Sequence, residues 1–507
     1  MKQAAAKKSD STPMMRQYTE IKRQNPSTVL LYRMGDFYEM FNEDAKIASK
    51  VLGLTLTSRN HGGTDATPLA GFPYHALERY ANRLVKAGHR IAICEQTEDP
   101  KKAKGVVKRD VIEIISAGTA TEGSFIDEKS NNYIMSVVVA GDRAGISICD
   151  LSTGEFSVEE TEKIKVKEEI VRIDPAELVT VDSDEDSPGG WNDADGMARR
   201  LVTKYDGWKF EQEHAQDVLK KHFSVASLQG LGLDGYSAGI RAAGALLSYL
   251  KEQKKSDLRH ISTILPRSLS RYAELDPASI RNLELLNPIH TEDTGGTLVS
   301  VLDKTCTAMG ARLLKRWITH PLKQEQEINR RLDCVEWLKK DVFVRGELEL
   351  LLKQIADIER LIGRITFERA NARDLCGLKN SLFTFPRIIK SLSSGSSNVI
   401  AGISQRLEGF GELAGKIEKT IVDNPPLSIR EGGLIRSGIS PELDEIKEAS
   451  VNGKKWIAGL QETERRKTGI SSLKVGFNKV FGYYIEISKT NLASVPQTYI
   501  RKQTLVN

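Results

Sequence analysis

The stretch Met34-Gly35-Asp36-Phe37-Tyr38-Glu39-Met40-Phe41 is the most informative part of this chain. Gly35 permits a tight turn that a residue with a side chain resists. On an extended backbone Phe37 and Glu39 share one face, and Tyr38 lies on the other. An aromatic ring beside a carboxylate suits contact with a nucleobase, because the ring can stack and the carboxylate can accept hydrogen bonds from a base edge. The same pattern is typical of the end of a core strand with an exposed acid, and this stretch alone favours that interpretation.

Further distinctive stretches follow along the chain. They are Pro68-Leu69-Ala70-Gly71-Phe72-Pro73-Tyr74-His75, Arg90-Ile91-Ala92-Ile93-Cys94-Glu95-Gln96, Leu275-Asp276-Pro277-Ala278-Ser279-Ile280-Arg281-Asn282, Met309-Gly310-Ala311-Arg312-Leu313-Leu314-Lys315-Arg316-Trp317 and Gly476-Phe477-Asn478-Lys479-Val480-Phe481-Gly482-Tyr483-Tyr484. In this order and spacing they resemble the bacterial MutS family of DNA mismatch-recognition proteins. The resemblance extends over about residues 12–507 and is highly specific, because several separated motifs agree.

Composition indicates an ordinary globular chain without metal or redox motifs. A chain of 507 residues predicts roughly three to five domains. Its hydrophobic content is 40% and its charged content 28%, and no apolar run reaches the roughly 18 residues of a membrane span. The polar segment 1–11 lacks the apolar core of a secretion signal and is expected to be a disordered tail. The five cysteines fit no zinc or Cys-x-x-Cys spacing.

Positive charge is concentrated at the two ends of the sequence. Residues 1–120 carry 19 Lys and Arg against 13 Asp and Glu, and residues 451–507 carry 10 against 3. Of the 73 basic and 68 acidic residues, this leaves 44 and 52 for the 330 residues between. Two basic segments favour a protein that holds a polyanion at two places, although an ordinary solvated surface is the alternative.

The pattern of apolar residues divides the chain into four parts. Residues 12–120 predict a compact α/β domain, with a turn at 59–67, and 131–250 a second one that opens with an antiparallel meander at 133–159. A loop is expected at 183–195. Residues 258–425 read as helical, and 426–507 contain a long charged helix followed by strands at 470–487.

The glycine motifs of nucleotide-binding proteins are either absent from this sequence or found in the wrong context. Gly230-Leu231-Gly232-Leu233-Asp234-Gly235 fits G-x-G-x-x-G, but a helix rather than a strand pattern surrounds it, which predicts a loop before a helix. No G-x-x-x-x-G-K-[ST] sequence occurs. We therefore expect no enzyme activity and no cofactor in this chain, which has the features of an N-terminal portion without the ATPase module of the family.

The resemblance implies a multidomain α+β fold: an α/β mismatch-binding domain, an RNase-H-like α/β connector, a mainly helical core with a lever, and a partial β clamp. It implies that Phe37 stacks at a mispair, that Glu39 bonds a displaced base, and that Met34 and Asp36 shape the tip. Six basic residues are expected to hold phosphates because of their type and place: Arg59, Lys108, Arg109, Lys454, Lys474 and Lys479.

Recognition of mismatched or looped duplex DNA to start mismatch repair is the function that the resemblance implies. The partners would be such DNA, a second copy in a dimer and a downstream repair protein, in the bacterial cytoplasm at the nucleoid. ATP and Mg²⁺ are implied for the full-length family protein. One alternative is a related protein that binds recombination or branched DNA, whose members lack the Phe-x-Glu tip. The other is a metal-dependent nuclease on the RNase-H-like domain. Against it, 133–140 contains no carboxylate, Asp142 lies in a turn, and Asp150 lies at a strand end without a matched partner nearby.

Overall fold

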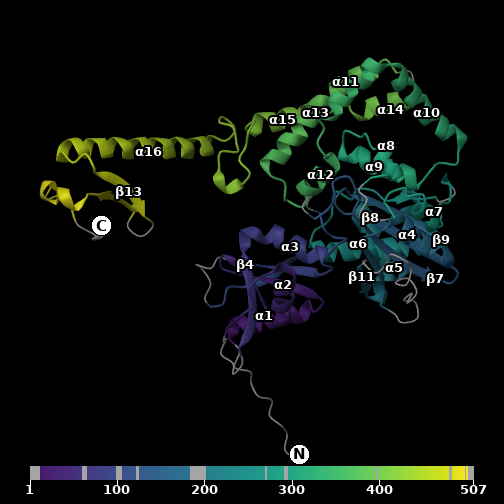
Figure 1. The fold of residues 1–507 in the computed structure, drawn as a ribbon, viewed down its shortest axis with the longest axis horizontal. Helices are drawn as coiled ribbons and strands as arrows, with labels where there is room; N and C mark the ends of the chain where they lie inside the picture. The colour runs from purple at the N-terminus through teal and green to yellow at the C-terminus, as the bar shows by residue number, and fades with distance from the viewer. Residues whose placement is uncertain are drawn as a thin grey trace, which may run out of the picture. The chain divides into compact units, whose positions relative to one another are not determined.

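The chain divides into two compact units, Met1–Ala414 and Gly415–Asn507. The computed structural model describes residues 12–59, 66–98, 105–121, 125–182, 201–268, 271–289, 295–395, 398–478, 482–496 and 498–500 (Figure 1). The expected tail at 1–11 and the expected loop at 183–195 lie outside these residues, as does most of the expected turn at 59–67.

The first unit begins with a mixed sheet. Within the described residues its strand order is β3-β4-β2-β1-β5-β6, with β1 and β5 parallel and the other neighbours antiparallel. The strands are β1 (Thr28–Met34), β2 (Phe37–Phe41), β3 (Thr57–Arg59), β4 (Thr67–Pro73), β5 (Arg90–Gln96) and β6 (Arg109–Ile115). The helices are α1 (Pro13–Gln24), α2 (Asn42–Leu52), the short η1 (Tyr74–Ala76) and α3 (Leu77–Lys86).

Strand alternation gives this sheet two apolar faces. Leu31 and Tyr38 pack into one buried cluster with residues of α2 and α3, whereas Leu30, Tyr32 and Phe41 pack into another with residues of α1. Successive side chains of a strand point to opposite faces, so a sheet covered on both sides needs apolar residues at nearly every position. The run 29–32 meets that requirement.

The second sheet confirms the predicted meander. Its order among the described strands is β11-β10-β7-β8-β9-β12. The antiparallel strands β7 (Tyr133–Ala140), β8 (Arg143–Asp150) and β9 (Glu155–Glu162) are followed by η2 (Lys163–Lys165) and α4 (Val166–Ile173). Strand β10 (Glu177–Val181) then runs parallel to β7, and β11 (Leu201–Tyr205) runs parallel to β10.

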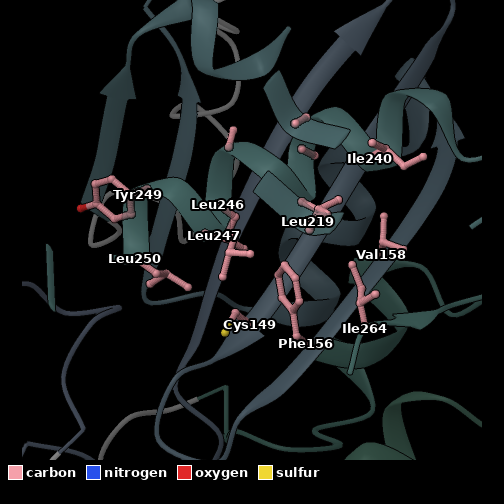
Figure 2. Packing of buried hydrophobic residues seen from close by; sticks show 14 of the residues in the cluster. Cys149, Phe156, Val158, Leu219, Ile240, Leu246, Leu247, Tyr249, Leu250 and Ile264 are labelled. Atoms are coloured by element: carbon pink, nitrogen blue, oxygen red, sulfur yellow. The ribbon is translucent and has the colours of Figure 1, made fainter. Parts of the chain in front are cut away.

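Helices cover both faces of this sheet. On one face, α5 (Gln212–Phe223) and α6 (Ser237–Lys254) enclose the largest buried cluster, in which Leu246 and Leu247 of α6 join Cys149 and Phe156 of the strands (Figure 2). On the other face, α4 packs on Met135 and Ile146. Short helical turns η4 (Gly207–Phe210) and η5 (Leu228–Leu231) connect these elements.

The helical region begins later than the sequence suggested. The described residues of 258–276 contain no α-helix, and β12 (Leu265–Pro266) pairs with β9 instead. Pro266 lacks the backbone N–H that a helix interior needs, so the expectation of helix from residue 258 was wrong for this segment. The helices that follow are α7 (Pro277–Asn282), α8 (Leu298–Leu302), α9 (Ala308–Thr319), α10 (Glu325–Lys340), α11 (Val342–Leu352), α12 (Ile358–Thr366), α13 (Ala372–Leu392), α14 (Asn398–Arg406) and α15 (Gly411–Thr420).

The second unit carries the predicted long helix and strands. The turn η7 (Ile429–Glu431) precedes α16 (Pro441–Thr468), which begins at the cap Ser440 and ends at Gly469 in the left-handed conformation. The antiparallel hairpin β13 (Lys474–Asn478) and β14 (Gly482–Glu486) and the turn η8 (Lys489–Ser494) follow. In neither unit do the described helices include one with the length and apolarity of a membrane span.

Candidate nucleic-acid interface

The turn between β1 and β2 is fixed at both its ends. Met34 and Phe37 are the last pair of the antiparallel ladder, so Gly35 and Asp36 form the connection. Gly35 has a φ of 58°, in the left-handed region where glycine is favoured. The backbone N–H of Tyr74 donates to the carbonyl of Asp36 at 2.8 Å. The tip is therefore held by β4 and η1 as well as by its own hairpin.

Strand β2 places Phe37 and Glu39 on one face and Tyr38 on the other, as the sequence predicted. The Phe37 side chain is 46% exposed, whereas Tyr38 is 2% exposed and packs in the cluster beneath α2 and α3. Glu39 is half-buried and lies opposite Tyr32 on β1 and Gly71 on β4. The first residue of β2 thus presents an aromatic ring to solvent, with the Glu39 carboxylate two positions further along the same face.

Gly71 makes room for the Glu39 side chain. A Cβ at Gly71 would lie 2.9 Å from the carbonyl oxygen of Tyr38 and 3.4 Å from Cγ of Glu39. Any larger residue at this position would push against the β2 backbone. This close approach gives a physical reason for glycine in the stretch 68–75 beside the hairpin.

Strand register places several predicted residues at one end of the sheet. Pro73 pairs with Phe37, Phe37 pairs with Met34, and Arg109 begins β6 opposite the last residue of β5. Strands β1 and β5 lie between β2 and β6, so the Phe37 and Arg109 backbones are about 14 Å apart. Lys108 precedes Arg109 and is exposed. The sheet end therefore combines an exposed aromatic ring, a carboxylate and two cations.

Arg109 is integrated into the fold at this sheet end. Its Nε donates to the carbonyl of Arg33 at 2.6 Å, and its Nη1 donates to Oε1 of Gln17 at 3.3 Å. Its guanidinium lies 4.9 Å from the ring centroid of Tyr32. Burial raises the pKa of Tyr32 to about 12, and the nearby Arg109 charge opposes that rise. These contacts fix a positive charge in a defined place.

The remaining predicted cations belong to other elements of the chain. Arg59 ends β3 opposite Thr67, and Thr67 lies at the other end of β4 from Pro73. Lys454 belongs to α16 of the second unit, and the exposed Lys474 begins β13 there. Lys479 and the side chains of Arg59 and Lys454 lie outside what the structure describes.

Sequence analysis did not identify three residues behind the hairpin as part of the site: Arg33, Tyr74 and Glu95. The guanidinium of Arg33 lies 3.9 Å from the ring centroid of Tyr74, and its Nη1 is 3.5 Å from Oε1 of Glu95. The hydroxyl of Tyr38 donates to the same Glu95 oxygen. Burial, then this hydrogen bond, raises the pKa of Tyr38 well above its usual value. The available signal was a single charged residue at the end of an apolar strand.

The Asp150 carboxylate, at the end of β8, is held by hydrogen bonds within the fold. Its carboxylate accepts hydrogen bonds from Nδ2 of Asn131 at 2.8 Å, from the backbone N–H groups of Asn132 and Ser152, and from Oγ of Ser152 at 2.6 Å. These hydrogen bonds connect the segment before β7 with the segment after β8. Across the described ranges no group of three His, Cys, Asp or Glu side chains could hold a metal ion.

The glycine-rich stretch 230–235 is a loop before a helix, as predicted. Helix α5 precedes it, the turn η5 ends within it at Leu231, and α6 begins at Ser237. A cavity of about 350 Å³ adjoins this loop, with Gln212, Gln216, Lys220 and Asp234 among its lining residues. A strand, which dinucleotide binding requires before such glycines, does not precede them in this described part of the chain.

The chain matches family models over most of its length. Residues 12–124 match MutS domain I, residues 132–262 match MutS domain II and residues 278–502 match MutS domain III. The sheet end that carries Phe37 and Arg109 therefore belongs to the part that matches domain I.

Whole-chain comparisons agree. A protein of Halothermothrix orenii described as DNA mismatch repair protein MutS is 45% identical over 98% of this chain and 55% of its own length. Proteins with the same description from Alkaliphilus oremlandii and Methanococcoides burtonii are 43% and 42% identical, each over 98% of this chain and 57% of its own length. The chain thus spans slightly more than half of the relatives it matches. On these three domain matches and this identity, the chain belongs to the MutS family of DNA mismatch repair proteins.

Proposed function

We propose that this chain recognises mispaired or looped duplex DNA by inserting Phe37 into the base stack. The observation that carries the proposal is the 46% exposure of Phe37 on a strand whose next aromatic residues, Tyr38 and Phe41, are buried. A large apolar ring at a braced hairpin tip contributes little to the core of the fold. It is available to wedge between bases, which is how apolar side chains kink a duplex.

Discrimination follows from the energetics of deformation. A mispaired step unstacks at lower cost than a paired one, so a wedge that needs an unstacked step binds mispairs more tightly. The Glu39 carboxylate, on the same face as Phe37, would accept a hydrogen bond from the displaced base. Met34, paired with Phe37, and Asp36 in the turn would set the shape of the tip.

Backbone phosphates would be held by the cations around this edge and in the second unit. Lys108 and Arg109 share the sheet end with Phe37, and Lys474 begins the hairpin of the second unit. Such contacts orient a protein on DNA and carry no sequence information. Arg59, Lys454 and Lys479 belong to the same proposal on the grounds of charge and position in the chain.

For the organisation of the protein we infer a mismatch-binding domain at 12–120, a connector at 131–250, a helical core at 258–425 and a lever with a partial clamp at 426–507. The β9-β8-β7-β10-β11 order, with parallel β7, β10 and β11, supports an RNase-H-like connector. The full-length protein would be a dimer that binds ATP and Mg²⁺ and recruits a downstream repair protein in the bacterial cytoplasm.

The test is binding of the purified chain to a labelled duplex with one G·T mispair and to its matched twin, measured by fluorescence anisotropy. The wild-type chain should prefer the mispair, and Phe37→Ala should abolish that preference. Its affinity for the matched duplex should change little, because phosphate contacts remain.

Phe343→Ala is the matched control. Phe343 is 92% exposed on α11, so the same truncation removes an exposed ring elsewhere in the chain. This variant should keep the wild-type preference. Retention of mismatch preference by Phe37→Ala, or its equal loss in Phe343→Ala, would refute the wedge.

A further inference from the structure

Arg33 occupies the face of the sheet opposite to Phe37, directly behind the proposed wedge. It pairs with Tyr38 in the β1–β2 ladder, one position before the Met34–Phe37 pair. Its side chain is 16% exposed. From this face the Arg33 side chain cannot reach a base that stacks on Phe37. Any effect of Arg33 on recognition must therefore act through the hairpin.

Arg33 contacts the turn and three of the elements that meet at this sheet end. Its Nε donates to the carbonyl of Gly35 in the turn at 2.5 Å. Its guanidinium lies over the Tyr74 ring of η1 at 3.9 Å and near the Tyr38 ring of β2 at 5.6 Å. Glu95 of β5 supplies its carboxylate partner.

The backbone of Arg33 extends this network to β6. Its carbonyl accepts the hydrogen bond from Nε of Arg109. One residue thus connects the turn before Phe37 to the cation placed at the far side of the sheet end. Tyr74, which Arg33 covers, also holds the turn through its N–H bond to Asp36.

We propose that Arg33 is a positioning residue that sets mismatch preference by holding the Phe37 hairpin in its insertion geometry. The inference rests on the proposed function and deepens it. A rigid tip favours insertion, because a mobile ring loses orientational entropy when it inserts. When the tip is already ordered in the folded protein, this entropy is not lost on binding. The difference in unstacking cost between mispaired and paired steps then appears undiminished in the ratio of the two affinities.

Lysine cannot replace arginine in this role. The planar guanidinium stacks on Tyr74 while its separate N–H groups reach Gly35 and Glu95. A lysine ammonium is a compact point charge that cannot stack and donate in two directions with the same geometry. Arg33→Lys therefore preserves the charge that attracts DNA and removes the bracing.

The test uses the same anisotropy assay, with 2-aminopurine beside the mispair to report unstacking. Arg33→Lys should lower the ratio of mismatched to matched affinity by about tenfold, equivalent to about 1.4 kcal/mol. Its affinity for the matched duplex should stay within about twofold, because the charge is retained. The 2-aminopurine signal on binding should fall in parallel with the ratio.

Two further variants separate bracing from a general loss of folding. Tyr74→Phe keeps the ring under Arg33 and should keep the preference, whereas Tyr74→Leu removes the ring and should lose it. Arg331→Lys is the matched control, since Arg331 lies 3.8 Å over the Trp317 ring in the helical region. It should bind both duplexes as the wild type does.

The outcomes distinguish this inference from the function on which it rests. A wild-type chain without mismatch preference overturns both. If the wild type prefers the mispair and Phe37→Ala does not, an unchanged ratio in Arg33→Lys overturns the positioning role alone. If Arg33→Lys also melts at a lower temperature, the test is the comparison of Tyr74→Phe with Tyr74→Leu. Equal mismatch preference in these two variants overturns the positioning role of Arg33.

Discussion

Glu113 of β6 forms a buried ion pair with Lys254 at the C-terminal end of α6, with side-chain exposures of 5% and 2%. The second carboxylate oxygen of Glu113 faces the guanidinium of Arg369, which follows α12. One carboxylate therefore joins the first sheet, the second sheet's main helix and the helical region. Arg90 of β5 adds a hydrogen bond to Gln253 beside this junction, at 3.0 Å.

Glu113→Gln should destabilise the first unit strongly. The amide keeps the shape of the side chain but removes the negative charge that faces two cations. Breaking a buried pair on one side costs about 3–5 kcal/mol, because the remaining charge stays out of water. Urea unfolding followed by tryptophan fluorescence and circular dichroism would measure the change.

Glu20→Gln is the control for this change. Glu20 pairs with Arg23 on the surface of α1, where both side chains are more than half exposed. Solvent screens such pairs, so this variant should unfold at the wild-type urea concentration. Equal midpoints for Glu113→Gln and Glu20→Gln would show that the junction does not hold the domains together.

His320 should make the fold less stable in acid. Burial, then the charges of Arg267 and Arg172, lowers its pKa to about 2, and Nη2 of Arg267 donates to its Nε2 at 2.6 Å. The unfolded chain takes up this proton below about pH 6.5, whereas the folded chain does not. The contribution of neutral His320 is therefore complete above pH 6.5 and is lost as the pH falls toward 2.

The comparison variant for this titration is His320→Gln, which can still accept a hydrogen bond from Arg267 and does not titrate. The difference in unfolding free energy between wild type and variant should fall by about 1.4 kcal/mol per pH unit below pH 6.5. Glu159, whose pKa burial raises to about 8, opposes this trend in both proteins, so the difference isolates His320. Parallel pH profiles would contradict the assignment.

The β1–β2 hairpin could be predicted from neighbouring residues, whereas the ion-pair junction at Glu113 could not. The alternation in β2 has a period of two residues, so the exposure of Phe37 beside a buried Tyr38 could be read locally. The meander β7–β9 was predictable for the same reason, and the helix α16 was predictable from its long charged helical pattern. Glu113, Lys254 and Arg369 come together from distant parts of the chain, and nothing near any of them indicates the others. Arg33 was visible, but its stacking on Tyr74 depends on how η1 follows β4.

Lys474→Ala should weaken matched and mismatched duplexes equally. Lys474 is exposed at the start of β13, and a phosphate contact there carries no information about the base pair. The slope of log affinity against log salt should fall by about 1, because one fewer counterion is released. Anisotropy titrations at several salt concentrations would measure both effects. Lys340→Ala, which removes an exposed lysine paired with Glu336, should change neither, and a mismatch-specific loss in Lys474→Ala would contradict a phosphate role.

Phe37 and Phe41 begin and end the same strand, which makes them a matched pair for separating wedge from core. Phe41 is 1% exposed and its ring meets Tyr18 edge to face at 4.8 Å, so Phe41→Ala should cost about 3–5 kcal/mol of unfolding free energy. Phe37 is exposed at the sheet end, and Phe37→Ala should stay within about 0.5 kcal/mol of the wild type. Urea unfolding of the three proteins in one buffer gives both numbers. If Phe37→Ala unfolds as easily as Phe41→Ala, the ring belongs to the core, and its loss of mismatch preference would reflect a damaged fold rather than a missing wedge.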